Sequence, residues 1–73
     1  MADDNRKTMK LQVNDEPLDF EGGTIAELLE RLGIQGRRLA VEVNREVIPR
    51  GEHADHELAD GDVVEIIHAV GGG

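Results

Sequence analysis

The feature that most constrains this chain is an amphipathic helical segment between residues 24 and 33. Its apolar side chains recur at the i, i+3, i+4 and i+7 spacing that places them on one face of a helix: Ile25, Leu28, Leu29 and Leu32. Thr24 and Glu27 match a capping box, in which each side chain accepts the other residue's backbone N–H. Gly33 stands where a glycine commonly ends a helix. The segment therefore predicts one short helix with a single buried face.

Alternating apolar and polar residues predict strands on both sides of this helix. Before it, residues 9–13 and 17–20 alternate around turn residues at 14–16. After it, the pattern returns at residues 39–43, 47–48 and 63–70, with Pro49 ending the short middle strand. Residues 50–61 are polar and irregular, with Leu58 as an apolar anchor. The order β-β-α-β-β-β predicts an α+β fold, a ubiquitin-like β-grasp with a mixed sheet of about five strands around the helix.

Three ranges follow from this pattern. Residues 1–8 are expected to be a flexible leader, residues 9–69 the β-grasp domain, and residues 70–73 a flexible tail carrying the functional carboxylate.

Composition narrows the class of partner. The chain has 73 residues, 16 acidic against 8 basic, and a formal net charge of −8. It has one aromatic residue and no long apolar run, so nucleic acid and membrane are not expected partners. An acidic chain suits basic protein surfaces. Without cysteine there is no disulfide, thiolate metal site or catalytic thiol, and a small domain of this kind is at home in the cytoplasm.

Besides the tail, four groups of residues are candidate sites, and each has a structural alternative. His53 and His56 could share a metal, but we expect a solvated loop and no metal site. His68, near the tail, has no partner nucleophile to support catalysis. The pair Gly22 and Gly23 could form an anion nest before the helix, although a turn that lets Thr24 cap the helix is favoured.

The fourth candidate lies on the last strand. If Val64 and Ile66 face the helix, Val63 and Ile67 face outward. An outward apolar pair is commonplace, yet it becomes a docking face if residues of neighbouring strands extend it. Both interpretations stay open at this point.

The sequence finishes with Val70, Gly71, Gly72 and Gly73. A terminal carboxylate, with a pKa of roughly 3.5, is ionised at pH 7 and must be activated before it can donate an acyl group. The sequence has no phosphate-binding motif of its own, so activation requires a second protein. Residues without Cβ atoms thread a narrow channel readily, and four extended residues reach about 13 Å. The alternative is a flexible end or a cloning scar.

With these residues in view, the chain resembles the sulfur carrier proteins of thiamine biosynthesis. The resemblance covers roughly Met9 to Gly73 and depends on LAVEVN-REVIPR, DGDVVEII and the terminal VGGG. It implies that Gly73 is adenylated and converted to a thiocarboxylate, with Gly72 and Gly71 completing the tail that enters the partner. Arg45 stands where the family turn commonly has glycine, so a different turn type is expected there.

The resemblance also implies partners. They are an adenylating, E1-like enzyme that uses ATP and Mg, a thiazole synthase and a sulfur-donating enzyme, while the carrier itself binds no cofactor, is not an enzyme and is a monomer when free. Terminal Gly-Gly alone is also found in the small subunit of molybdopterin synthase and in ubiquitin-like protein modifiers. These two remain alternatives, together with a structural domain whose tail has no function.

Overall fold

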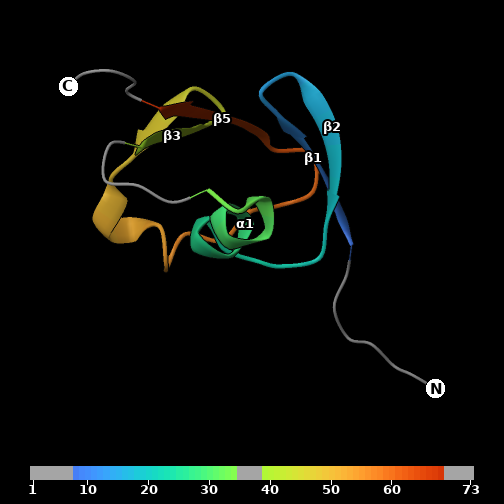
Figure 1. Cartoon of the computed structure of the whole chain (residues 1–73). Coiled ribbons are helices and arrows are strands. Elements are labelled where there is room, and N and C mark those ends of the chain that lie inside the picture. Colours follow the sequence, from blue (N-terminus) through green and yellow to red (C-terminus); the bar gives the residue numbers. More distant parts are fainter. Residues whose placement is uncertain (1–7, 35–38, 69–73) are drawn as a thin grey trace.

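The computed structural model describes residues 8–34 and 39–68, and its elements follow the predicted order (Figure 1). These are β1 (Met9–Val13), β2 (Glu16–Phe20), α1 (Ile25–Leu32), β3 (Leu39–Val43), β4 (Glu46–Ile48), the 3-10 helix η1 (Arg50–Glu52) and β5 (Val63–His68). The strands form one sheet in the order β2-β1-β5-β3-β4. Strands β1 and β5 are parallel and every other neighbouring pair is antiparallel, so the predicted mixed five-stranded sheet is confirmed.

Helix α1 has the caps that the sequence predicts. Thr24 Oγ1 accepts the Glu27 N–H at 3.2 Å, and Glu27 Oε1 accepts the Thr24 N–H at 2.9 Å. Gly33 ends the helix in the left-handed conformation, with φ of 72°, and its N–H donates to the Glu30 carbonyl at 3.1 Å. Both ends are therefore fixed by local sequence.

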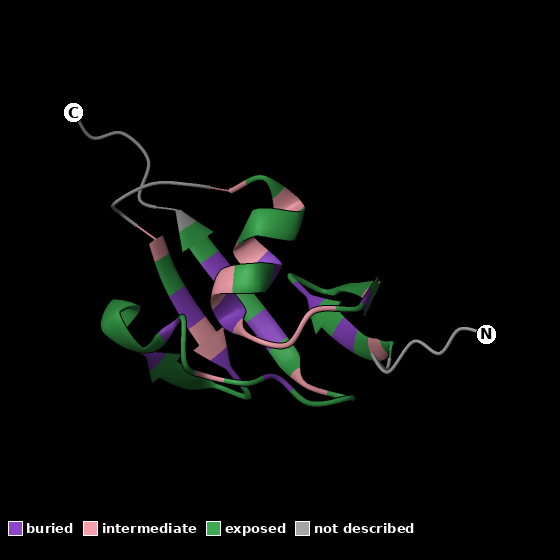
Figure 2. Cartoon of the chain, turned by 90° about the horizontal axis from the view of Figure 1, so that it is seen from below, coloured by how far each residue is buried: buried purple, intermediate pink, exposed green. Residues whose placement is uncertain are grey.

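The helix covers one face of the sheet, and the core lies between them (Figure 2). Ile25 and Leu28 are fully buried, while Leu29 and Leu32 pack at the edge of the core. The sheet contributes alternate residues, namely Leu11, Val13, Phe20, Val41, Val43, Ile48, Val64 and Ile66, and Leu58 closes the core as predicted. No helix among the described residues is long and apolar enough to cross a membrane.

The two hairpins turn through left-handed residues. Asn14 and Asp15 have φ of 50° and 71°, and Asn44 and Arg45 have φ of 53° and 73°. Two consecutive positive φ values in a two-residue loop are the type I′ geometry that matches strand twist. At Asn44 and Arg45 the chain adopts the turn that glycine favours and places an arginine at its second position, because the pairing of Val43 with Glu46 leaves a two-residue loop. The expectation that this turn differs in type from that of the family stays a prediction.

The segment after β4 is more ordered than its polar composition indicates. Pro49 precedes η1, in which the N–H groups of Glu52 and His53 donate to the carbonyls of Pro49 and Arg50 at 2.8 and 3.1 Å. The expected irregular, solvated loop is thus wrong for His53, which is 7% exposed. Its Nε2 lies 3.0 Å from the Ile48 carbonyl oxygen, which can only accept, so Nε2 carries the proton.

Candidate functional site

Strand β5 leads directly to the glycine tail and lies between β1 and β3. In addition to the backbone hydrogen bonds with β1 and β3, the side chain of one asparagine from each hairpin turn bonds to β5. Asn14 Oδ1 accepts the Ile66 N–H at 2.8 Å, and Asn44 Oδ1 accepts the Val63 N–H at 3.0 Å. The parallel pairing with β1 spans only two residues of β5, so Asn14 extends it by one side-chain bond. The strand that carries the tail is therefore fixed from both sides.

The DGD motif has a structural explanation in the same region. Asp60 Oδ1 accepts the Lys10 N–H at 2.7 Å, and Gly61, with φ of 93°, donates its N–H to the Lys10 carbonyl at 2.8 Å. Asp62 Oδ1 accepts Asn44 Nδ2 at 3.1 Å, and Asp62 Oδ2 accepts the Ala59 N–H at 2.9 Å. The VEVN and DGD motifs are thus bonded to each other, and together they set the start of β5.

The outer face of the sheet carries the exposed apolar residues. Val63 and Ile67 are 41% and 48% exposed, while Val64 and Ile66 face the helix, as the alternation predicts. Val47 of β4, 61% exposed, lies on the same face, because it alternates with buried Ile48. Within residues 8–34 and 39–68 these three are the exposed large hydrophobic residues. Sequence reasoning missed Val47, although its alternation with Ile48 is a signal that could have found it.

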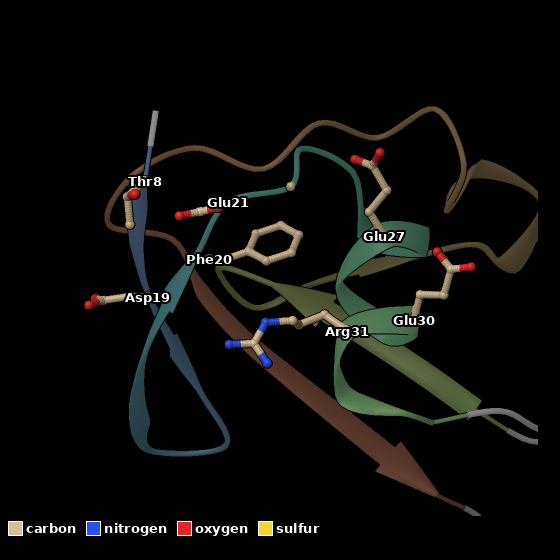
Figure 3. Close-up of a pocket in the computed structure, with 8 residues that line it drawn as sticks. Thr8, Asp19, Phe20, Glu21, Glu27, Glu30 and Arg31 are labelled. Carbon is tan, nitrogen blue, oxygen red and sulfur yellow. The ribbon is translucent and has the colours of Figure 1, made fainter. Parts of the chain in front are cut away.

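A hollow of about 720 Å³ lies between β2 and the helix, but its charged groups do not converge (Figure 3). The Phe20 ring lies between strand and helix, and the Arg31 side chain extends toward β2. The carboxylates of Asp19 and Glu21 point away from the hollow. Such an arrangement has no focus for a metal ion or a phosphate, and within the part of the chain that the structure describes no three acidic or histidine side chains group as a metal site.

The helix N-terminus offers no anion site either. The N–H groups of Ile25 and Ala26 donate to the carbonyls of His56 and His53 at 3.1 and 3.0 Å, and the capping box satisfies the next donor. A helix binds anions through free N–H groups in its first turn. The turn interpretation of Gly22 and Gly23 therefore holds, and the two histidines serve the helix through their backbone carbonyls. His56 is half-buried, whereas the His68 side chain lies outside the described residues.

The predicted carrier residues Gly71, Gly72 and Gly73 also lie outside the described residues, as do residues 1–7 of the leader. Among the described residues, Val63 and Ile67 of the outer face lie on the strand that precedes the tail in the sequence. Its exposed apolar residues can bind another protein surface.

Comparison with known proteins identifies relatives of this chain in sequence and in fold. A sulfur carrier protein ThiS of Thermus thermophilus is 41% identical over 61 residues, which cover 84% of this chain and 95% of that protein. The crystal structure of the thiamine biosynthesis protein ThiS from Geobacter metallireducens matches with a TM-score of 0.75 at 36% identity, covering 89% of this chain and 100% of that one. This likeness confirms the ubiquitin-like β-grasp.

A third relative is much longer. The thiazole synthase of Paramagnetospirillum magneticum is 41% identical over 66 residues, which cover 89% of this chain and 20% of the synthase. The chain therefore spans about a fifth of the length of that relative. The ThiS family model matches residues 5–73, from before β1 through the three glycines. The chain thus belongs to the ThiS family, the family of the sulfur carrier proteins of thiamine biosynthesis.

Proposed function

We propose that this chain carries sulfur for thiazole formation in thiamine biosynthesis as a thiocarboxylate on Gly73. The observation that carries the proposal is the family match, which extends through residue 73 and includes the tail as well as the domain. The absence of cysteine from the sequence supports it, because a sulfur carrier without a thiol needs another group to hold the sulfur. The tail carboxylate is that group.

The proposed chemistry has two steps on the carboxylate of Gly73. First, a carboxylate oxygen attacks the α-phosphorus of ATP, pyrophosphate leaves, and an acyl-adenylate forms. Hydrosulfide, which is sulfur at the sulfide oxidation level, then attacks the acyl carbon and AMP leaves, and loss of the S–H proton gives the thiocarboxylate. The thiocarboxylate is an ionised, soft nucleophile at neutral pH, by analogy with a thiolate. The carrier supplies the acyl group and catalyses neither step.

Three partners follow from this chemistry: an adenylating enzyme that uses ATP and Mg, an enzyme that donates sulfur, and a thiazole synthase that accepts it. The thiazole synthase has support among the relatives, because one protein of that name contains a segment 41% identical to this chain. A carrier and its acceptor within one polypeptide have a high effective concentration for each other. We therefore propose that this chain presents its tail directly to a thiazole synthase.

The proposed contact has two parts. The outer face of the sheet, through Val63, Ile67 and Val47, docks on the partner, and the tail, residues 70–73, enters the partner's active site. Exposed apolar residues gathered on one sheet face are suited to such a contact. Glycine suits the tail because a closed active site that excludes water has little room for Cβ atoms.

Gly73→Ala tests whether the tail enters a narrow channel of the activating enzyme. We expect the variant to fold as the unaltered chain does, with unfolding free energy within about 0.5 kcal/mol, since a tail residue contributes little to packing. We expect its adenylation, measured as pyrophosphate exchange into ATP by the activating enzyme, to fall sharply because the methyl group crowds the channel. Exchange at the unaltered rate would contradict the threading, and covalent attachment to lysines of other proteins would instead support a protein modifier.

A further inference from the structure

Two glutamates face each other at the centre of the outer sheet face. Glu42 of β3 lies directly opposite Glu65 of β5 in the antiparallel register. Residues opposite each other in such a pair have Cβ atoms about 4.5–5.5 Å apart. Glu65 is exposed and Glu42 is half-buried, so both carboxylates are accessible from the same side of the sheet.

The surroundings of the pair are apolar on the sheet. Along β5 the next residues on this face are Val63 and Ile67, and across from Glu42 on β4 is Val47. On β3 the next residue toward the strand's start is Ala40, which pairs with Ile67. None of these neighbours is basic. Lys10 of β1 bonds to Gly61, four positions before Glu65, and Arg45 lies in the turn between β3 and β4, so neither is directly opposite the pair. Glu42 and Glu65 are therefore two acidic residues at directly opposite positions.

Like charges directly opposite each other destabilise a sheet. A basic group placed between the two carboxylates converts this repulsion into two charge-assisted hydrogen bonds. Arginine suits the position better than lysine, because its planar guanidinium donates in two directions to carboxylates and is more weakly hydrated. The apolar rim of Val47, Val63 and Ile67 excludes water around such a pair and strengthens it.

We propose that Glu42 and Glu65 together bind one arginine side chain of the adenylating enzyme and so select that partner. This inference rests on the proposed function. Charge complementarity favours this occupant: an enzyme that binds the triphosphate of ATP places cationic side chains around its active site, and the glutamate pair lies on the strand that leads to the tail. The apolar rim provides contact area, while the pair selects a basic partner surface.

The test compares two double variants of equal charge. Glu42→Gln/Glu65→Gln removes the pair, and Glu16→Gln/Glu30→Gln removes two exposed carboxylates from β2 and α1. We measure the dissociation constant for the activating enzyme by calorimetry at low and at physiological salt. We expect the first variant to bind at least about tenfold more weakly and to lose most of the salt dependence. The control is expected to stay within about twofold of the unaltered chain.

Folding is checked on the same samples. Because the first variant relieves a like-charge repulsion, we expect its urea midpoint to equal or exceed that of the unaltered chain. Weaker binding together with an intact fold then assigns the loss to the interface. Equal weakening in both variants would show a general charge effect and overturn the inference.

Two further outcomes separate this inference from the proposed function. If the unaltered chain becomes thiocarboxylated but the first variant binds the activating enzyme as tightly, the inference fails and the carrier function stands. If the first variant loses affinity only for the thiazole synthase, the assignment of the arginine to the adenylating enzyme is wrong. If the unaltered chain is never thiocarboxylated, the proposed function fails, and the inference that rests on it fails as well.

Discussion

At the scale of single residues, Gly22 packs against the ring of Phe20. A Cβ atom built on Gly22 overlaps the end of the ring and lies 2.7 Å from Cε1, and Phe20 is 2% exposed, so the ring has no free space to move into. We expect Gly22→Ala to lower the free energy of unfolding by about 1–3 kcal/mol, as overpacking does. Urea unfolding followed by circular dichroism measures the change.

Gly51→Ala is the matched control for that substitution, because a Cβ atom on Gly51 meets nothing within 4 Å. We expect its effect to stay within about 0.5 kcal/mol. Equal effects of the two substitutions would show that the contact with Phe20 does not limit the side chain at Gly22.

Arg45 has a backbone conformation that favours glycine, with φ of 73°. The left-handed region costs an L-residue other than glycine about 1–2 kcal/mol. Glycine avoids this cost, but it loses more backbone entropy on folding, which offsets part of the stabilisation. We therefore expect Arg45→Gly to raise the free energy of unfolding by about 0.5 kcal/mol. Arg31→Gly in α1 is the control and is expected to lower it by about 1 kcal/mol. A loss of stability in Arg45→Gly would contradict the turn geometry.

At the scale of elements, α1 is held to the sheet by its buried face. Leu28 is fully buried, whereas Leu29 is half-buried at the edge of the core. We expect Leu28→Ala to cost about 2–5 kcal/mol, the loss of buried methyl groups plus the cavity that they leave. Leu29→Ala should cost clearly less in the same chemical denaturation. A loss for Leu28→Ala no larger than that for Leu29→Ala would contradict the packing of this helix.

The elements that the sequence predicts well are those with local signals. Helix α1 has its cap, its stripe and its C-terminal glycine within ten consecutive positions, and the alternation in β5 separates Val64 from Val63 correctly. The burial of His53 has no such signal. It results from η1, which returns the chain to the helix N-terminus so that the carbonyls of His53 and His56 accept its N–H groups.

Contacts between distant segments explain what else the sequence did not predict. Asn14 and Ile66 are joined across 52 positions, and Asn44 and Val63 across 19. Turn composition indicates an asparagine in each hairpin, but not that both side chains bond the same strand. The register that places Glu42 opposite Glu65 is equally nonlocal, so the glutamate pair could be found only once the sheet order was known.

At the scale of the whole molecule, the domain separates folding from function. Asn44 of the VEVN motif and Asp62 of the DGD motif bond to each other and to the backbone, and Asn44 holds the start of β5. The outer face stays open, and the proposed chemistry belongs to a terminal group beyond the strand. The net charge of −8 favours basic partner surfaces.

Intact mass spectrometry of the chain tests the central claim most directly. The chain is incubated with ATP, Mg, a sulfur source and the activating enzyme of the same genome, beside a variant that lacks Gly73. Sulfur carriage on Gly73 predicts a mass gain equal to replacing one oxygen by sulfur in the unaltered chain alone. An unchanged mass, with the activating enzyme shown to be active on another carrier, would contradict sulfur carriage on Gly73.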